Sequence, residues 1–297
     1  MTRLMLLFAL CNTFLSFGQE EMTAPIFGKV KFIFEESFEA DFDGVTYSKI
    51  GKNRQVSWMN DNKMEFDKRG HLIKRTFYDD ARNYIHSEEF VFSDSLLQSK
   101  SHLSFIFSYL YDSTGKIVAE LVAPNSDSLA MKLKHRFAYN EKNQLTEVWE
   151  FDFNGGHVSH QINEYNTQGF LSKETFEYQD GKEYIQYRYD TLNQLLKKEW
   201  YDAQVGLMER TSYAYLNGKL VSEFWEGINK NKVETSTKSE FDEYGNAISV
   251  LDVNSKRQIH DHEVNTYVFD SDHNWIRKTT SINNSRFYIV ERRIAYY

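Results

Sequence analysis

Hydrophobic and polar residues alternate along most of the chain with a period of two. Around residue 150, Leu145, Glu147, Trp149 and Phe151 fall on one side of an extended chain, and the residues between them fall on the other. Such alternation is typical of a β-strand, because successive side chains point to opposite faces of the sheet. It recurs over 105–111, 185–189 and 233–241, and no segment of similar quality has a helical period. The pattern predicts an all-β protein with little or no helix.

A seven-residue motif recurs between the alternating segments. It consists of an aromatic residue, Asp or Asn, two variable residues, Gly or Asn, another variable residue, and Leu or Ile. From Tyr111 onward the opening aromatic residues are 24 to 28 residues apart. Repetition at this interval indicates a repeat architecture. The clear copies are 66–72, 111–117, 139–145, 165–171 and 189–195, and the looser copies are 215–220, 241–247 and 269–275.

The residue types of the motif predict a hairpin turn. Asp or Asn at the second position can accept backbone N–H groups, and Gly or Asn at the fifth position tolerates a positive φ. A type I turn closed by such a residue is a common connection between antiparallel strands. We therefore expect these structural turn residues: Gly70, Gly115, Asn143, Gly169, Asn193, Gly218 and Gly245.

Further turn signals between the motifs divide each unit into two strands. This predicts roughly 16–18 antiparallel strands in a single repeat domain over 42–297, entered by an N-terminal segment, 19–41. Hairpin repeats of this kind would form a long curved sheet or partial shell. The last strand, 286–297, carries Glu291, Arg292 and Arg293 among apolar residues. Such charges are typical of a strand at an exposed sheet edge.

The Tyr-Asp-x-x-Gly-x-Leu pattern, with strands rich in Thr, Lys, Glu and aromatic residues, resembles the YD-repeat (RHS-type) proteins of bacteria. The resemblance covers about residues 42–297. It implies hairpins that run on as a continuous curved sheet, which encloses a toxin segment in the largest members. The units here are longer than usual and the strand pattern continues to Tyr296, so no toxin cargo is implied. A weaker resemblance, to MORN-like repeats, rests on Asn217 to Leu220.

The first 18 residues have the pattern of a secretory signal peptide. Arg3 gives a basic start, 4–17 is largely apolar, and Ser16 and Gly18 are small residues before a cut at Gln19. A buried N-terminal helix and a lipoprotein signal ending at Cys11 are the alternatives. Cleavage would remove Cys11, the single cysteine of the chain, so the exported protein would contain no disulfide. We expect a periplasmic, outer-surface or secreted protein.

Composition narrows the possible partners. The chain has 297 residues with 35 Lys and Arg against 43 Asp and Glu, a formal charge of −8, and no basic patch. We therefore expect no nucleic-acid partner. Past the N-terminus no apolar run is long enough for a transmembrane helix, so we expect no transmembrane segment in the mature chain. The hydrophobic share of 41% suits a large folded domain.

Motifs for catalysis or metal binding are few. The sequence contains no nucleophile elbow, phosphate-binding loop or His-Glu-x-x-His. His260 and His262 would share one face of a strand and could bind Zn²⁺ together, but the sequence supplies no third ligand, and we expect no metal and no cofactor. Neighbours such as Glu35 and Glu36 face opposite sides of a strand, so a catalytic acid and base would come from different strands.

Aromatic residues remain as functional candidates. Rings of this size fill pleated sheets, and an open row of them could stack on sugars or peptides. We predict a non-enzymatic repeat protein that acts as a binding or scaffolding surface for carbohydrate or an envelope protein. The alternative is an envelope enzyme, such as a glycan hydrolase, whose carboxylates come from different strands. The candidate ligand-binding residues are Tyr184, Tyr187, Trp200, Tyr201, Phe224 and Trp225.

Overall fold

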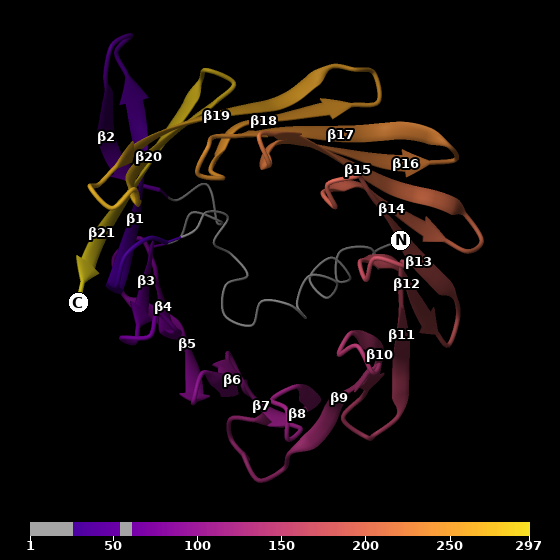
Figure 1. Cartoon of the computed structure of the whole chain (residues 1–297). Coiled ribbons are helices and arrows are strands. Elements are labelled where there is room, and N and C mark those ends of the chain that lie inside the picture. Colours follow the sequence, from indigo (N-terminus) through magenta and orange to yellow (C-terminus); the bar gives the residue numbers. More distant parts are fainter. Residues whose placement is uncertain (1–25, 54–60) are drawn as a thin grey trace. The chain divides into compact units, whose positions relative to one another are not determined.

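The computed structural model describes residues 26–53 and 61–297 (Figure 1). These residues form 21 strands, so the prediction of an all-β antiparallel fold is confirmed. No helix in the described ranges is long and apolar enough to cross a membrane. The predicted signal peptide, 1–18, lies outside the described residues. The strands are β1 (Val30–Phe42), β2 (Tyr47–Lys52), β3 (Asp61–Phe66), β4 (Leu72–Tyr78), β5 (Tyr84–Ser93), β6 (Leu96–His102), β7 (Phe105–Tyr111), β8 (Ile117–Pro124), β9 (Lys132–Tyr139), β10 (Leu145–Phe151), β11 (His157–Tyr165), β12 (Leu171–Tyr178), β13 (Lys182–Tyr189), β14 (Leu195–Asp202), β15 (Gly206–Leu216), β16 (Lys219–Asn229), β17 (Lys232–Phe241), β18 (Ala247–Asn254), β19 (Ile259–Phe269), β20 (Trp275–Ile282) and β21 (Arg286–Tyr296).

The described strands outnumber the predicted 16–18. Some of the additional strands flank turns whose residues depart from the clear copies of the motif. Asp94 and Ser95 connect β5 to β6 with φ values of 49° and 77°, although neither residue is Gly or Asn. Near the N-terminus, β1 and β2 form a further hairpin, which begins inside the segment predicted only to enter the sheet.

The described residues group into two compact units. One combines the described residues up to Ile106 with Tyr267–Lys278 and Tyr288–Tyr297, and the other consists of Phe107–Thr266 and Thr279–Phe287. The first unit has an apolar core centred on β1 and β3. This core contains Val30, Ile33, Met64 and Phe66, with Ile26, Leu72, Ile294 and Tyr296 packed against it.

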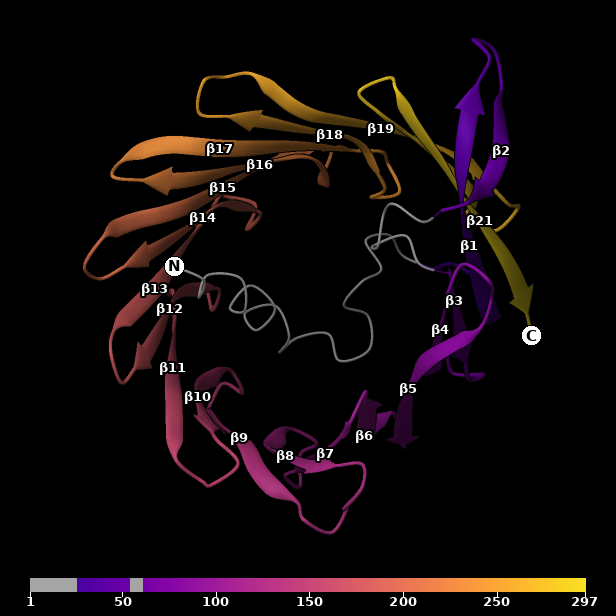
Figure 2. The same ribbon diagram turned by 180° about the vertical axis from the view of Figure 1, so that it is seen from behind.

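The first and last strands, β1 and β21, pair with each other, and they lie side by side in both views (Figure 1 and Figure 2). The backbone N–H of Tyr297 donates to the carbonyl of Lys29 at 2.9 Å, and the Arg292 guanidinium lies 2.6 Å from the Glu35 carboxylate. The C-terminal strand is therefore paired, and its charges form ion pairs with β1. The predicted long curved sheet or partial shell with an exposed C-terminal edge is wrong, because the first and last strands pair with each other.

The motif forms a turn closed by its Asp or Asn side chain. Oδ1 of Asp190 accepts the N–H groups of Leu192 and Gln194, both at 2.8 Å, and the N–H of Asn193 donates to the Asp190 carbonyl at 3.1 Å. Gly218 instead belongs to a two-residue turn with Asn217, where both residues have positive φ. The φ values are 90° at Gly70, 84° at Gly115, 65° at Asn143 and Asn193, 91° at Gly169, 80° at Gly218 and 85° at Gly245.

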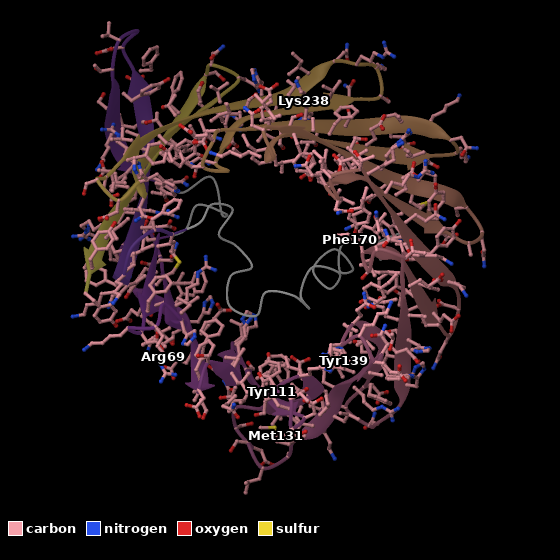
Figure 3. All side chains as sticks on the ribbon, in the orientation of Figure 1. Arg69, Tyr111, Met131, Tyr139, Phe170 and Lys238 are labelled. Carbon is pink, nitrogen blue, oxygen red and sulfur yellow. The ribbon has the colours of Figure 1, made fainter. Side chains whose placement is uncertain are left out.

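In three units the opening Tyr of the motif connects the unit to the preceding one. Its hydroxyl donates to the backbone carbonyl of the last residue of the previous motif, on the neighbouring strand. Burial raises the pKa of these tyrosines, and Tyr111 and Tyr139, labelled in Figure 3, begin consecutive motifs. The motif thus fixes the spacing of neighbouring hairpins. The bonds join Tyr139 to Ile117 at 2.9 Å, Tyr165 to Leu145 at 2.7 Å and Tyr189 to Leu171 at 2.9 Å.

Candidate functional site

The candidate site lies on one face of β12 to β16, within the second unit. Strand pairing places Trp200 of β14 opposite Glu209 of β15, and Glu209 opposite Gly227 of β16. In the other direction Trp200 is opposite Ile185 of β13, which is opposite Glu174 of β12. Directly opposed residues share a face and lie close enough to interact. Side chains from five strands therefore meet on this face.

Two tryptophans on this face donate to carboxylates on the strand before them. Nε1 of Trp200 donates to Glu183 and Nε1 of Trp225 donates to Glu209, each at 3.1 Å. Glu183 is opposite Asp202 and Glu209 is opposite Gly227, so each carboxylate faces the position two residues after its tryptophan. The same arrangement thus occurs twice, two strands apart. We call Glu183, Trp200, Glu209 and Trp225 the indole-carboxylate row.

The Trp225 indole lies over the backbone of β16 at Gly227. A Cβ atom at residue 227 would come within 2.9 Å of Cη2 of Trp225, and equally close to Oγ1 of Thr235 on β17. Because no side chain stands at Gly227, the ring can rest on the strand and donate to Glu209. Both Trp200 and Trp225 are half-buried, so part of each ring reaches the surface.

The carboxylates of this face occupy a partly desolvated environment. Burial raises the pKa of Glu183, and repulsion from Asp202 raises it further. Burial also raises the pKa of Glu174, Glu209 and Glu223, while the nearby Lys198 ammonium partly offsets the rise at all three. Perturbed carboxylates beside aromatic rings are typical of binding and catalytic sites.

The structure divides the six predicted ligand-binding residues between the two faces of the sheet. Tyr187, Trp200 and Trp225 lie on the face of the indole-carboxylate row, where the Tyr187 hydroxyl donates to Glu174. The other three lie on the opposite face: Tyr184 stacks on Tyr201 with ring centroids 4.8 Å apart, and Phe224 is 39% exposed.

Sequence reasoning missed the carboxylates of the site. Glu183 alternates with Ile185 and Tyr187, so their shared face could have been read from the strand pattern. The opposition of Trp200 and Glu209 could not, because the β14–β15 register shifts between Trp200 and Tyr201.

Other candidate groups do not form a site. His260 has 75% of its side chain exposed, and Asp261 pairs with Arg286 at 2.9 Å. Among the described residues no group of three or more His, Cys, Asp or Glu could hold a metal ion. Glu35 and Glu36 pair with Arg292 and Arg293 of β21, so this acidic pair belongs to the contact between β1 and β21.

Comparisons with known proteins give matches in structure alone. No protein-family model and no curated protein matches the chain. A porin-like protein from Bacteroides uniformis is 8% identical, with a TM-score of 0.37, over 91% of this chain and 98% of its own. A porin-like protein from Bacteroides vulgatus is 11% identical, with a TM-score of 0.32, over 90% and 98%. The Photorhabdus luminescens Tc holotoxin pore is 11% identical, with a TM-score of 0.20, over 80% of this chain and 19% of its own.

The predicted YD-repeat (RHS-type) identity is wrong. No family model for such repeats matches the chain. The pairing of β1 with β21 gives the physical reason. Hairpins of the predicted kind would continue as an open sheet, whereas the two ends of this strand series are hydrogen-bonded to each other.

Proposed function

We propose that this chain is a non-enzymatic envelope protein that binds carbohydrate on the indole-carboxylate row. The observation that carries the proposal is the repeated pair of a half-buried indole and a carboxylate on neighbouring strands. The electron-rich face of an indole attracts the C–H edge of a sugar ring. A carboxylate accepts hydrogen bonds from sugar hydroxyls and fixes the orientation of the ligand.

The charged residues on the opposite face of β12 to β16 favour contact with solvent. This face carries ion pairs between Lys182 and Glu177, at 2.9 Å, and between Arg188 and Glu199, at 3.4 Å. A strand face turned to lipid needs a band of apolar residues, and a charged residue there is destabilising. With carboxylates on one face and ion pairs on the other, β12 to β16 suit contact with a dissolved or surface-exposed glycan.

An envelope location agrees with the N-terminal sequence. The basic Arg3, the apolar stretch that follows and the small residues Ser16 and Gly18 fit export through a signal peptide. The proposal therefore places the protein in the periplasm, on the outer surface or in the medium.

Co-sedimentation with insoluble cellulose, chitin and peptidoglycan sacculi tests the proposal. The parent protein is expected to sediment with at least one of these, and the double variant Trp200→Ala, Trp225→Ala is expected to remain in solution. Trp149→Phe is the matched control, because Trp149 lies on the opposite sheet face, stacked on His160. Equal sedimentation of the double variant and the parent would rule out the row as the binding surface.

A second candidate function is hydrolysis of a glycan. Burial raises the pKa of Glu183 and of Glu209 and so favours it, since the general acid of a glycosidase is a carboxyl group whose surroundings raise its pKa. Release of reducing ends from the polysaccharides above, lost in both Glu183→Gln and Glu209→Gln, would establish it. Binding without release of reducing ends would leave the binding function alone.

A further inference from the structure

We propose that the indole-carboxylate row takes a linear oligosaccharide of at least three sugars that carries no acidic groups, laid diagonally across β14 to β16. This inference rests on the proposed function and adds the size, charge and direction of the ligand. It is carried by the spacing of the two indole-carboxylate pairs and by the charges around them.

Strand register sets the distance between the two pairs. Trp200 is opposite Glu209, which is opposite Gly227, so Trp225 lies two strands away and two residues back along the strand. Two strand spacings of about 4.8 Å and two residues of about 3.4 Å each separate the equivalent points by about 12 Å. One sugar ring covers roughly half of this distance. A chain that stacks on both indoles therefore places two rings on them and a third ring between.

The orientation of the two indoles supports a ligand that continues from one to the other. Both rings donate Nε1–H to the strand before them, at the same distance. Because β14 and β16 run in the same direction, both side chains lean the same way along the sheet. A ligand with a regular repeat meets the same surface at both ends, whereas a single sugar uses only one pair.

Charge selects against acidic polysaccharides. Strand register places Glu174, Glu183, Glu209 and Glu223 on one face, and the Lys198 ammonium lowers the pKa of three of them, Glu183 excepted. Like charges brought together at an interface are repelled. Hydroxyl and acetamide N–H groups, by contrast, donate to carboxylates. The ligand is therefore a neutral glycan chain.

Isothermal titration with two neutral series tests the inference: cello-oligosaccharides and N-acetyl-chito-oligosaccharides of one to six sugars. In the series that binds, we expect the Kd to fall at least tenfold between the disaccharide and the tetrasaccharide. Trp225→Ala should bind the tetrasaccharide no better than the parent binds the disaccharide, and Trp149→Phe should retain the full gain. Oligogalacturonate of four sugars, the anionic control, should bind at least tenfold more weakly.

The outcomes separate the inference from the proposed function. Equal affinity for the disaccharide and tetrasaccharide, with binding still lost in Trp200→Ala, would overturn the inference and leave carbohydrate binding intact. Oligogalacturonate binding as tightly as the neutral tetrasaccharide would also overturn it. Failure of both neutral series to bind at millimolar concentration would overturn both the inference and the proposed function. Circular dichroism spectra that match the parent would confirm that the variants are folded.

Discussion

Gly227 allows the Trp225 indole to lie on β16. A methyl group at this position would stand 2.9 Å from the ring and from Oγ1 of Thr235, closer than van der Waals contact permits. We expect Gly227→Ala to move the indole away from Glu209, to weaken glycan binding and to lower stability by about 1–3 kcal/mol through overpacking. Titration with the tetrasaccharide and thermal unfolding measure both effects. Gly181→Ala is the control, since a Cβ there meets nothing within 4 Å; equal effects of both variants would contradict this account.

Gly70 is suited to test the backbone strain in the turns of the repeated motif, because a Cβ atom there would clash with no neighbouring atom. Its φ is 90°, and a Cβ there would meet no atom within 4 Å, so a substitution acts through the backbone alone. We expect Gly70→Val to destabilise by about 1–2 kcal/mol. Gly70→Asn should cost less, because Asn143 and Asn193 occupy the same motif position at φ 65°. Urea unfolding decides, and identical midpoints for the parent and both variants would show that the position carries no strain.

Glu223 should make stability depend on pH. Burial raises its pKa in the folded protein, so its contribution to stability is fully present below the unfolded pKa and is lost as pH rises through the folded pKa. Glutamine cannot ionise. Glu223→Gln should therefore melt at a higher temperature than the parent at pH 8, with no such gain at pH 4.

Glu36 provides the opposite case as a control. Its pKa is lowered despite burial, through hydrogen bonds and attraction from Lys52 and Arg82, and Arg293 lies 3.1 Å away. Its contribution is present above the unfolded pKa and is lost as pH falls through the folded pKa. Glu36→Gln should lower the melting temperature at pH 8, and the difference should shrink in acid. The same pH response in both variants would refute the electrostatic assignment.

At the scale of strands, alternation and turn chemistry were readable from the sequence. The period-two segments became strands, because side-chain alternation depends only on the local backbone. The faces of a strand were readable too, as Glu183, Ile185 and Tyr187 show. Register between strands was not readable. The shift between Trp200 and Tyr201 leaves no local signal, and it decides that Trp200 faces Glu209.

The contact between β1 and β21 depends on a largely buried ion pair. Arg292 and Glu35 have side-chain exposures of 11% and 15%, and the guanidinium also lies 3.4 Å from the centroid of the Trp275 ring. Arg292→Met would leave Glu35 without its cation, and we expect a loss of about 3 kcal/mol in urea unfolding. Adding Glu35→Gln should recover part of this loss, whereas no recovery would mean that the charge pair is unimportant.

A more exposed ion pair, between β2 and β21, serves as the comparison. Lys49 and Glu291 lie 2.6 Å apart with side-chain exposures of 36% and 35%. Such pairs contribute about 1 kcal/mol or less. Lys49→Met should therefore change stability much less than Arg292→Met, and equal losses would contradict the distinction between the two pairs.

At the scale of the whole molecule, the sequence misled in one respect. Glu291, Arg292 and Arg293 have the pattern of a guarded edge, because charges protect an unpaired strand. The same residues can bind a distant strand, and here they pair with Lys49, Glu35 and Glu36. Pairing between the two ends of a long chain depends on contacts far apart in sequence. Local periodicity does not encode such pairing, so the pairing of β1 with β21 could not be predicted from the sequence pattern.

The ¹⁵N–¹H spectrum of the indole groups tests the central claim most directly. The chain has 5 Trp, each with one indole signal, assigned through single Trp→Phe variants. On titration with the neutral oligosaccharide that binds, the signals of Trp200 and Trp225 should shift together and saturate at one Kd, because their Nε1–H groups donate to carboxylates inside the site. Trp149, on the opposite face, should remain in place. Saturable shifts at Trp149 with none at Trp200 and Trp225 would contradict the account.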